Sequence, residues 1–174
     1  PGMLTLLLVL RVIHVVGGVF WAGSSFLMAG FIEPAVRSAG DDGRRFMQSF
    51  NTHSRFSTVI AATAGATVLA GLWLMWIISA GLSEGFFETG RGLGLGIGMW
   101  AAILAFILGF VMQNRPLRRM AAIGSTVAAS GGPPSPAQAA EMEKLMGTVR
   151  LGGRLVAGLL LITVVTMATA RYWP

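Results

Sequence analysis

The sequence contains no cysteine and little charge. Without cysteine, disulfides, thiolate metal sites, iron–sulfur clusters and cysteine nucleophiles are excluded. Charged residues make up 11% of the 174 residues, whereas an ordinary soluble domain is about 25% charged. The composition therefore gives poor support to a soluble enzyme, a DNA-binding domain or a disordered chain.

Apolar residues are abundant instead. Hydrophobic residues make up 54% of the chain, and the mean hydropathy is +0.70. This composition predicts a small integral membrane protein, built as a single domain over residues 1–174. Its principal partner is then the lipid bilayer.

The net charge of +6 is carried by basic residues at the boundaries of apolar segments. Ten of the thirteen Lys and Arg residues fall in two groups that lack interleaved aromatic residues on a polar surface, so we expect no nucleic-acid partner. The pattern is typical of the cytoplasmic face of a membrane protein. The two groups are Arg37, Arg44, Arg45 and Arg55, and then Arg115, Arg118, Arg119, Lys144, Arg150 and Arg154.

Four segments are long and apolar enough to cross a bilayer, which requires about 20 residues of helix. They predict an all-α integral membrane protein, an antiparallel four-helix transmembrane bundle. The first segment is too long for a signal peptide and contains Arg11, so we expect it to be retained. The Arg-rich loops are expected in the cytoplasm, with both termini outside a bacterial inner membrane. The predicted spans cover about 3–32, 57–80, 93–112 and 151–170.

The segments between the spans carry helix start and stop signals. Glu33-Pro34 is expected to end the first span, because proline disfavours a helical residue before it. Residues 44–50 place apolar side chains on one side and predict a short interfacial helix. Residues 131–134 are expected to break any helix. The run Ser135-Pro136-Ala137-Gln138 then predicts a helix start that continues into the fourth span.

Glycines alternate at the start of the third span, from Gly90 to Gly98. Pairs four residues apart, such as Gly94 and Gly98, let transmembrane helices approach closely. The pattern predicts tight helix packing along this face.

Arg11 and His14 are the most informative residues, because ionisable groups within a span are costly and usually face the protein interior. They belong to a set of residues spaced three and four apart, which places the set on one helix face. This face is more polar than the rest of the span, so we expect it to face the protein or a cavity. The set is Arg11, His14, Gly18, Trp21, Ser25 and Met28.

Three interpretations of this pair stay open, the third being that the two residues handle protons or a substrate. In the first, Arg11 reaches outward and His14 hydrogen-bonds a neighbouring carbonyl. In the second, His14 ligates a metal or haem, and Arg11 neutralises a carboxylate such as a haem propionate. Met75 and Met167 fall at about the depth of His14 and are candidate second ligands, because thioethers ligate haem iron and Cu(I). His53 lies about 27 Å further toward the inner side, too far to share one iron with His14.

The carboxylates do not form a catalytic or proton-relay group. All seven fall in loops or near span ends, and no nucleophile, base and acid occur together. The sequence therefore assigns no catalytic residues.

Residues 10–26, LRVIHVVGGVFWAGSSF, carry a motif in which His14 is followed seven residues later by Trp21-Ala22-Gly23. This motif resembles the CopD-like copper-resistance proteins, the HemJ-like protoporphyrinogen oxidases and the amino-terminal membrane region of cytochrome-linked urate oxidases. Residues 31–37 and 46–48 look like four-span bacterial proteins of the same general kind. In HemJ-like proteins the matching histidine is associated with haem, so the resemblance implies that role for His14.

These observations predict a membrane protein that holds a b-type haem, with His14 as axial ligand and with Arg11, Trp21, Met75 and Met167 at the site. Its role would be electron transfer or haem-linked redox chemistry, with a membrane redox partner or as a homo-oligomer. Two alternatives stay open. One is a non-enzymatic accessory or assembly subunit without cofactor, and the other is transport of copper or a small solute.

Overall fold

The computed structural model describes residues 2–174, with every side chain except that of Thr52. These residues form helices and short connections and contain no strand. Residue 1 of the predicted domain lies outside the described residues. The elements are α1 (Gly2–Leu27), the π-helix η1 (Met28–Ile32), α2 (Glu33–Ser38), α3 (Gly40–His53), α4 (Phe56–Ile78), α5 (Glu84–Phe87), α6 (Gly90–Gly109), the π-helix η2 (Phe110–Asn114), α7 (Arg115–Ser130), α8 (Pro136–Thr169) and the 3-10 helix η3 (Ala170–Tyr172).

Four of the helical stretches are long and apolar enough to cross a membrane. This confirms the all-α class and the number of apolar helices. Their bounds differ from the predicted spans. The second helix ends two residues earlier than predicted, whereas the other three are longer than predicted and longer than the bilayer is thick. At 1.5 Å per residue, the 41-residue third stretch is about 60 Å long. The four are Gly2–Ser38, Phe56–Ile78, Gly90–Ser130 and Pro136–Tyr172.

Two prolines lie inside these helices. The expectation that the first helix ends at Pro34 is wrong, because η1 precedes this proline and α2 continues to Ser38. Pro116 follows η2 in the same way, and α7 continues to Ser130. In an α-helix, a proline ring clashes with the backbone carbonyl four residues earlier. In a π turn, backbone hydrogen bonds join residues five apart instead of four. The wider turn therefore lets both helices pass through proline without ending.

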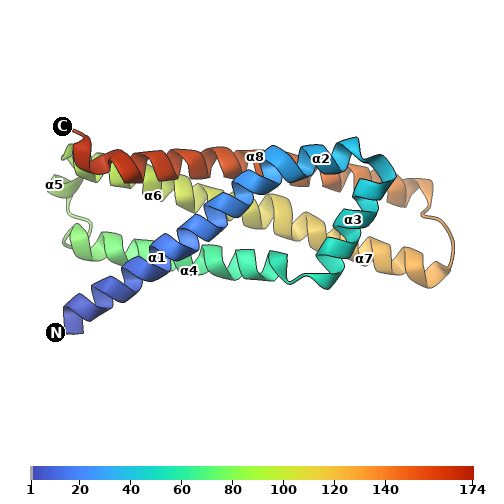
Figure 1. Ribbon diagram of the computed structural model, residues 1–174, viewed down its shortest axis with the longest axis horizontal. Coiled ribbons are helices and arrows are strands. Elements are labelled where there is room, and N and C mark those ends of the chain that lie inside the picture. The colour runs from blue at the N-terminus through green and yellow to red at the C-terminus, as the bar shows by residue number, and fades with distance from the viewer. Residues whose placement is uncertain (1) are drawn as a thin grey trace.

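The chain reverses direction from each long helix to the next (Figure 1). Both termini and α5 lie at one end of the molecule, and α2, α3 and α7 lie at the other. In the same view α3 runs across the direction of the long helices. The two basic groups of the sequence fall in α2, α3, the turn before α4, α7 and the N-terminal part of α8. They therefore gather toward the end opposite to the termini.

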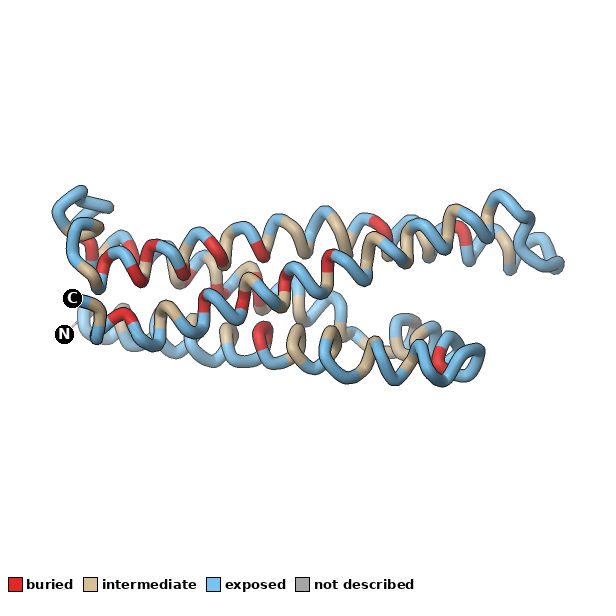
Figure 2. The backbone as a smooth tube through the Cα atoms, turned by 90° about the horizontal axis from the view of Figure 1, so that it is seen from above, coloured by how far each residue is buried: buried red, intermediate tan, exposed pale blue. Residues whose placement is uncertain are grey.

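A small core joins the four long helices. Trp21 packs among small and aliphatic residues from α4, α6 and α8, and its ring meets Phe106 edge to face at 6.4 Å between centroids. Buried positions recur along the helices with exposed ones between them (Figure 2). Large apolar side chains such as Leu69 (69%) and Trp100 (67%) are exposed, as expected of helices that face lipid. The buried cluster is Trp21, Ala22, Ala64, Ala105, Val156 and Leu160.

The alternating glycines bring α6 against α8, which confirms the predicted close packing. A methyl group on Gly98 would lie 2.6 Å from Cγ of Met167, and one on Gly94 would lie 3.1 Å from Cβ of Ala170. The Thr163 hydroxyl on α8 donates to the Gly98 carbonyl at 3.2 Å. Only glycine leaves room for this approach.

Two other local predictions have clear outcomes. The amphipathic helix predicted over residues 44–50 is longer, since α3 covers Gly40–His53. The start of α8 is confirmed as a capping box: the Ser135 hydroxyl accepts from the Gln138 N–H, and the Gln138 side chain accepts from the Ser135 N–H. As expected, α7 ends at Ser130, before Gly131 with its φ of +66°.

Candidate functional site

His14 joins α1 to α4. Its Nδ1 lies 2.8 Å from the backbone carbonyl oxygen of Thr67. Its ring packs on Gly71, where an added methyl group would lie 2.6 Å from Cε1. His14 is half-buried. The hydrogen bond to Thr67 fixes the orientation of the ring, and Gly71 leaves the space that the ring occupies.

This hydrogen bond fixes the roles of the two ring nitrogens. A carbonyl oxygen can only accept, so Nδ1 carries the proton in the bond to Thr67. In the neutral ring the lone pair is then on Nε2, which has no hydrogen-bond partner among the described residues. Histidines that ligate metals are commonly oriented in this way, through a carbonyl that accepts from the other ring nitrogen.

Thr67 carries a second unusual feature. Its hydroxyl oxygen is buried and has no hydrogen-bond partner within the described part of the chain. The hydroxyl lies against Gly17 of α1, where an added methyl group would overlap it. A buried hydroxyl normally has a partner, so Thr67 carries an unsatisfied polar atom in the same residue whose carbonyl bonds His14.

Arg11 lies one turn from His14 but does not share its environment. The rest of the polar set predicted on α1 is buried or half-buried, whereas Arg11 is exposed. No acidic partner of Arg11 occurs among the residues that the structure describes. Its guanidinium is therefore available to a group outside the chain.

Trp21 belongs to the core and does not adjoin His14. Seven residues of helix separate the two, which corresponds to about 10 Å along the axis. The Trp21 side chain is 5% exposed and packs against Phe106.

The two candidate methionines fall at different helix interfaces. Met75 is 4% exposed and lies one turn beyond Gly71 on α4, the helix that His14 contacts. Met167 packs against Gly98, at the interface of α6 and α8. Of the two, Met75 is therefore the one placed on a helix beside His14.

His53 lies at the far end of the molecule. It is exposed at the end of α3, and its Nδ1 lies 3.1 Å from the Ser49 carbonyl oxygen. At least 11 residues of α4 separate it from Thr67, or about 17 Å. Within the described residues, no group of three His, Cys, Asp or Glu side chains could hold a metal ion.

The sequence reasoning missed a charged cluster around Glu33. The carboxylate lies 3.7 Å from Nε of Arg150 and 3.3 Å from a terminal nitrogen of Arg154, both on α8. One of its oxygens is buried without a hydrogen bond in the described part of the chain. Glu33 was expected at the end of the first span, and no local signal in the sequence indicates its two arginine partners, which lie more than 100 residues away.

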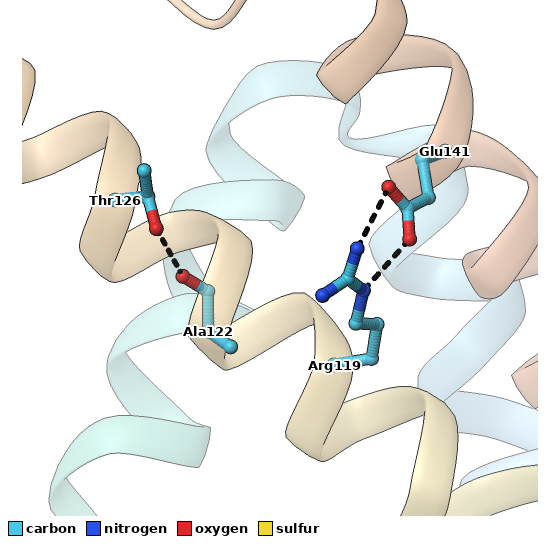
Figure 3. A network of polar contacts seen from close by, with 4 residues as sticks. All are labelled: Arg119, Ala122, Thr126 and Glu141. Atoms are coloured by element: carbon cyan, nitrogen blue, oxygen red, sulfur yellow. Dashed lines mark hydrogen bonds and ion pairs between the residues drawn. The ribbon is translucent and has the colours of Figure 1, made fainter.

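A second ion pair links α7 to α8 beyond the predicted spans (Figure 3). Nε of Arg119 donates to Glu141 at 2.8 Å, and a second guanidinium nitrogen donates at 3.4 Å. This hydrogen bond lowers the pKa of Glu141 and raises the pKa of Arg119. Both side chains are exposed, so the pair links the two helices but contributes little to the free energy of unfolding.

Two cavities lie near the end of the molecule that holds α3. One of about 240 Å³ is lined by Leu27, Met28, Ile32, Phe46, Phe50 and Phe56. The other, of about 70 Å³, is lined by Ser24, Ser25, Met28, Ala29, Phe56, Ile60, Gln113 and Gly153. Neither includes His14.

Comparisons of the chain with models of protein families, with curated proteins and with solved structures found no match.

Proposed function

We propose that the chain is a four-span protein of the bacterial inner membrane, arranged as an antiparallel four-helix transmembrane bundle. The reversal of direction between successive long helices supports this arrangement. The gathering of basic residues at one end supports a cytoplasmic position for that end, with both termini outside. The course of α3 across the long helices, together with its basic and aromatic residues, supports a position in the inner membrane interface.

Within this bundle, His14 ligates a b-type haem through Nε2. The observation that carries this proposal is the hydrogen bond from Nδ1 to the Thr67 carbonyl, because it orients the ring and leaves the lone pair on Nε2. The unpartnered Thr67 hydroxyl beside it supports a polar atom of a ligand at the same level.

The neighbouring residues suit the other parts of a haem. Arg11 supplies an exposed cation one turn from His14 for a propionate, whose charge would otherwise be costly near the apolar region. Met75 offers a thioether on the helix that His14 contacts. A haem bound there supplies one-electron redox chemistry, and the chain supplies the ligand, the charge partner and an apolar surround. With copper in its place, His14 and Met75 would be the ligands.

The experiment is an absorption spectrum of the detergent-solubilised protein expressed with adequate haem supply. We expect a Soret band that His14→Ala largely removes, that Arg11→Ala weakens less, and that His53→Ala retains. Added imidazole should restore the band of His14→Ala, because it replaces the lost ligand without replacing the helix contact.

A pair of glycine variants tests the geometry of the site. Gly71→Ala places a methyl group 2.6 Å from Cε1 of His14 and should shift or weaken the band. Gly65→Ala on the same helix is the matched control, because its methyl group would meet only Phe106 at 4.0 Å. A colourless wild type after haem reconstitution refutes the haem proposal. A band that survives His14→Ala but disappears in His53→Ala means that the other histidine holds the haem.

An accessory subunit without cofactor is the second candidate. The bond from His14 to Thr67 also fits this role, since it locks α1 to α4 by itself. Gly23, Gly30 and Gly158 have open space where a side chain would be, which suits close contact with helices of another protein. Co-purification of the colourless protein with a stable membrane partner would favour this candidate.

A further inference from the structure

We propose that the apolar cavity under α3 holds an acyl chain of an anionic phospholipid, whose phosphate is bound at Arg55. The cavity of about 240 Å³ is lined by six apolar side chains and by no polar one. This lipid site rests on the membrane placement proposed above and is independent of the haem.

The walls of the cavity come from three segments that meet at the basic end of the molecule. The end of α1 with η1 supplies Leu27, Met28 and Ile32, and the other walls are phenylalanines of α3 and α4. Phe46 stacks on Phe50 at 6.0 Å between centroids, and Phe50 meets Phe56 at 5.2 Å. These rings form a continuous apolar surface from the exposed side of α3 to the first turn of α4.

The cavity is open toward the side where lipid would lie. Leu27 and Phe46 are 53% and 54% exposed although they line it. An apolar cavity of this kind does not hold water, because water there would find no polar partner. A hydrocarbon chain matches its lining, whereas a polar or charged ligand would lose its hydration without compensation.

The depth of the cavity corresponds to the inner edge of the membrane. Leu27 and Ile32 fall in the last turns of the first predicted span, and Phe56 begins the helix that holds the second. Arg55, which directly precedes Phe56, then lies at the level of the lipid headgroups. The apolar cavity therefore lies at the depth of the hydrocarbon chains, and Arg55 lies at the depth of the phosphate that adjoins them in a phospholipid.

Charge complementarity selects an anionic lipid. Arg55 is exposed and has no acidic partner among the described residues. On α3, the acidic partners of Arg44 and Arg45 within the described residues are Asp41 and Asp42 of the same exposed helix, and such surface pairs are weak. Guanidinium groups bind phosphate through charge-assisted hydrogen bonds, and basic sites between helices on the cytoplasmic side bind anionic headgroups.

The test uses nanodiscs that contain equal amounts of phosphatidylglycerol and phosphatidylcholine with identical acyl chains. After mild detergent extraction, native mass spectrometry counts the lipids that stay bound to the whole chain. Wild type should retain phosphatidylglycerol in preference to phosphatidylcholine. Arg55→Gln should lower this preference about fivefold, the factor expected for one basic residue near an anionic surface.

Arg118→Gln is the matched control, because Arg118 is an exposed arginine of α7 at the same end, without an acidic partner in the described residues. It should leave the preference unchanged. Leu27→Trp should fill the cavity and release the retained lipid, with helical content unchanged by circular dichroism. Equal retention of the two lipids by wild type, or equal loss of preference in Arg55→Gln and Arg118→Gln, overturns the site. Failure to enter nanodiscs would instead refute the membrane placement itself.

Discussion

Replacement of Gly98 by alanine tests the contact between α6 and α8 most directly. The added methyl group would lie 2.6 Å from Cγ of Met167 and 2.9 Å from the hydroxyl oxygen of Thr166. Both distances are shorter than ordinary van der Waals contact, so α8 must shift or Met167 must change its conformation. A shift would also stretch the hydrogen bond from Thr163 to the Gly98 carbonyl, now 3.2 Å.

The size of the effect follows from two costs and one gain. An extra methylene in a packed contact costs about 1–3 kcal/mol. Loss of an interhelical hydrogen bond in a membrane protein costs roughly 0.6 kcal/mol on average. Alanine favours helix over glycine by about 1 kcal/mol. Gly158→Ala provides the control, because a methyl group there meets nothing within 4 Å. The propensity gain is common to both variants, so Gly98→Ala should be about 1.6–3.6 kcal/mol less stable than Gly158→Ala.

The assay is unfolding of the purified protein in mixed micelles with increasing SDS, followed by tryptophan fluorescence and far-ultraviolet circular dichroism. Gly98→Leu and Gly94→Leu should lose more stability than Gly98→Ala, since a larger side chain forces the helices further apart. If Gly98→Ala is as stable as Gly158→Ala, and both leucine variants match wild type, then these glycines face lipid and the described contact is refuted.

Three further predictions concern the two ends of the molecule. A reporter fused after Pro174 should behave as periplasmic, because the basic loops belong inside; cytoplasmic behaviour would reverse the proposed orientation. The ion pair of Arg119 with Glu141 lowers the pKa of Glu141, so it contributes above the usual pKa of a glutamate and is lost as pH falls through the lowered value. After correction for the intrinsic pH dependence of exchange, amide protection factors in the facing parts of α7 and α8 should therefore fall at acidic pH, and Glu141→Gln should remove this fall. Ser135→Ala should cost the start of α8 about 0.5–2 kcal/mol, visible as faster exchange over residues 136–140, and unchanged exchange there would show that the cap contributes nothing.

The sequence alone was sufficient for the elements whose causes are local. Four apolar runs of membrane length predict four long helices, because hydropathy and bilayer thickness act on contiguous residues. The capping box at Ser135 and the break at Gly131 are likewise set within a few residues. The close approach at Gly98 was predictable because small residues repeat at the helical spacing.

Local rules failed where a helix continued against its own signal. Pro34 disfavours an α-helical residue before it, and the sequence offered no indication that a π turn would relieve the clash. The same holds for Pro116 after η2. Whether a proline ends a helix or is absorbed by it depends on what packs against the flanking turns.

The candidate site was only half determined by sequence. Spacing placed His14 and Trp21 on one face of the first helix, and that face turns toward the protein except at the exposed Arg11. The partner of His14, the carbonyl of Thr67, lies 53 residues away, and Glu33 meets Arg154 across 121 residues. Such pairs depend on the rotation and depth at which helices dock, which no single segment specifies. The sequence thus decided which residues could carry chemistry, and the tertiary structure decided which of them have neighbours to support it.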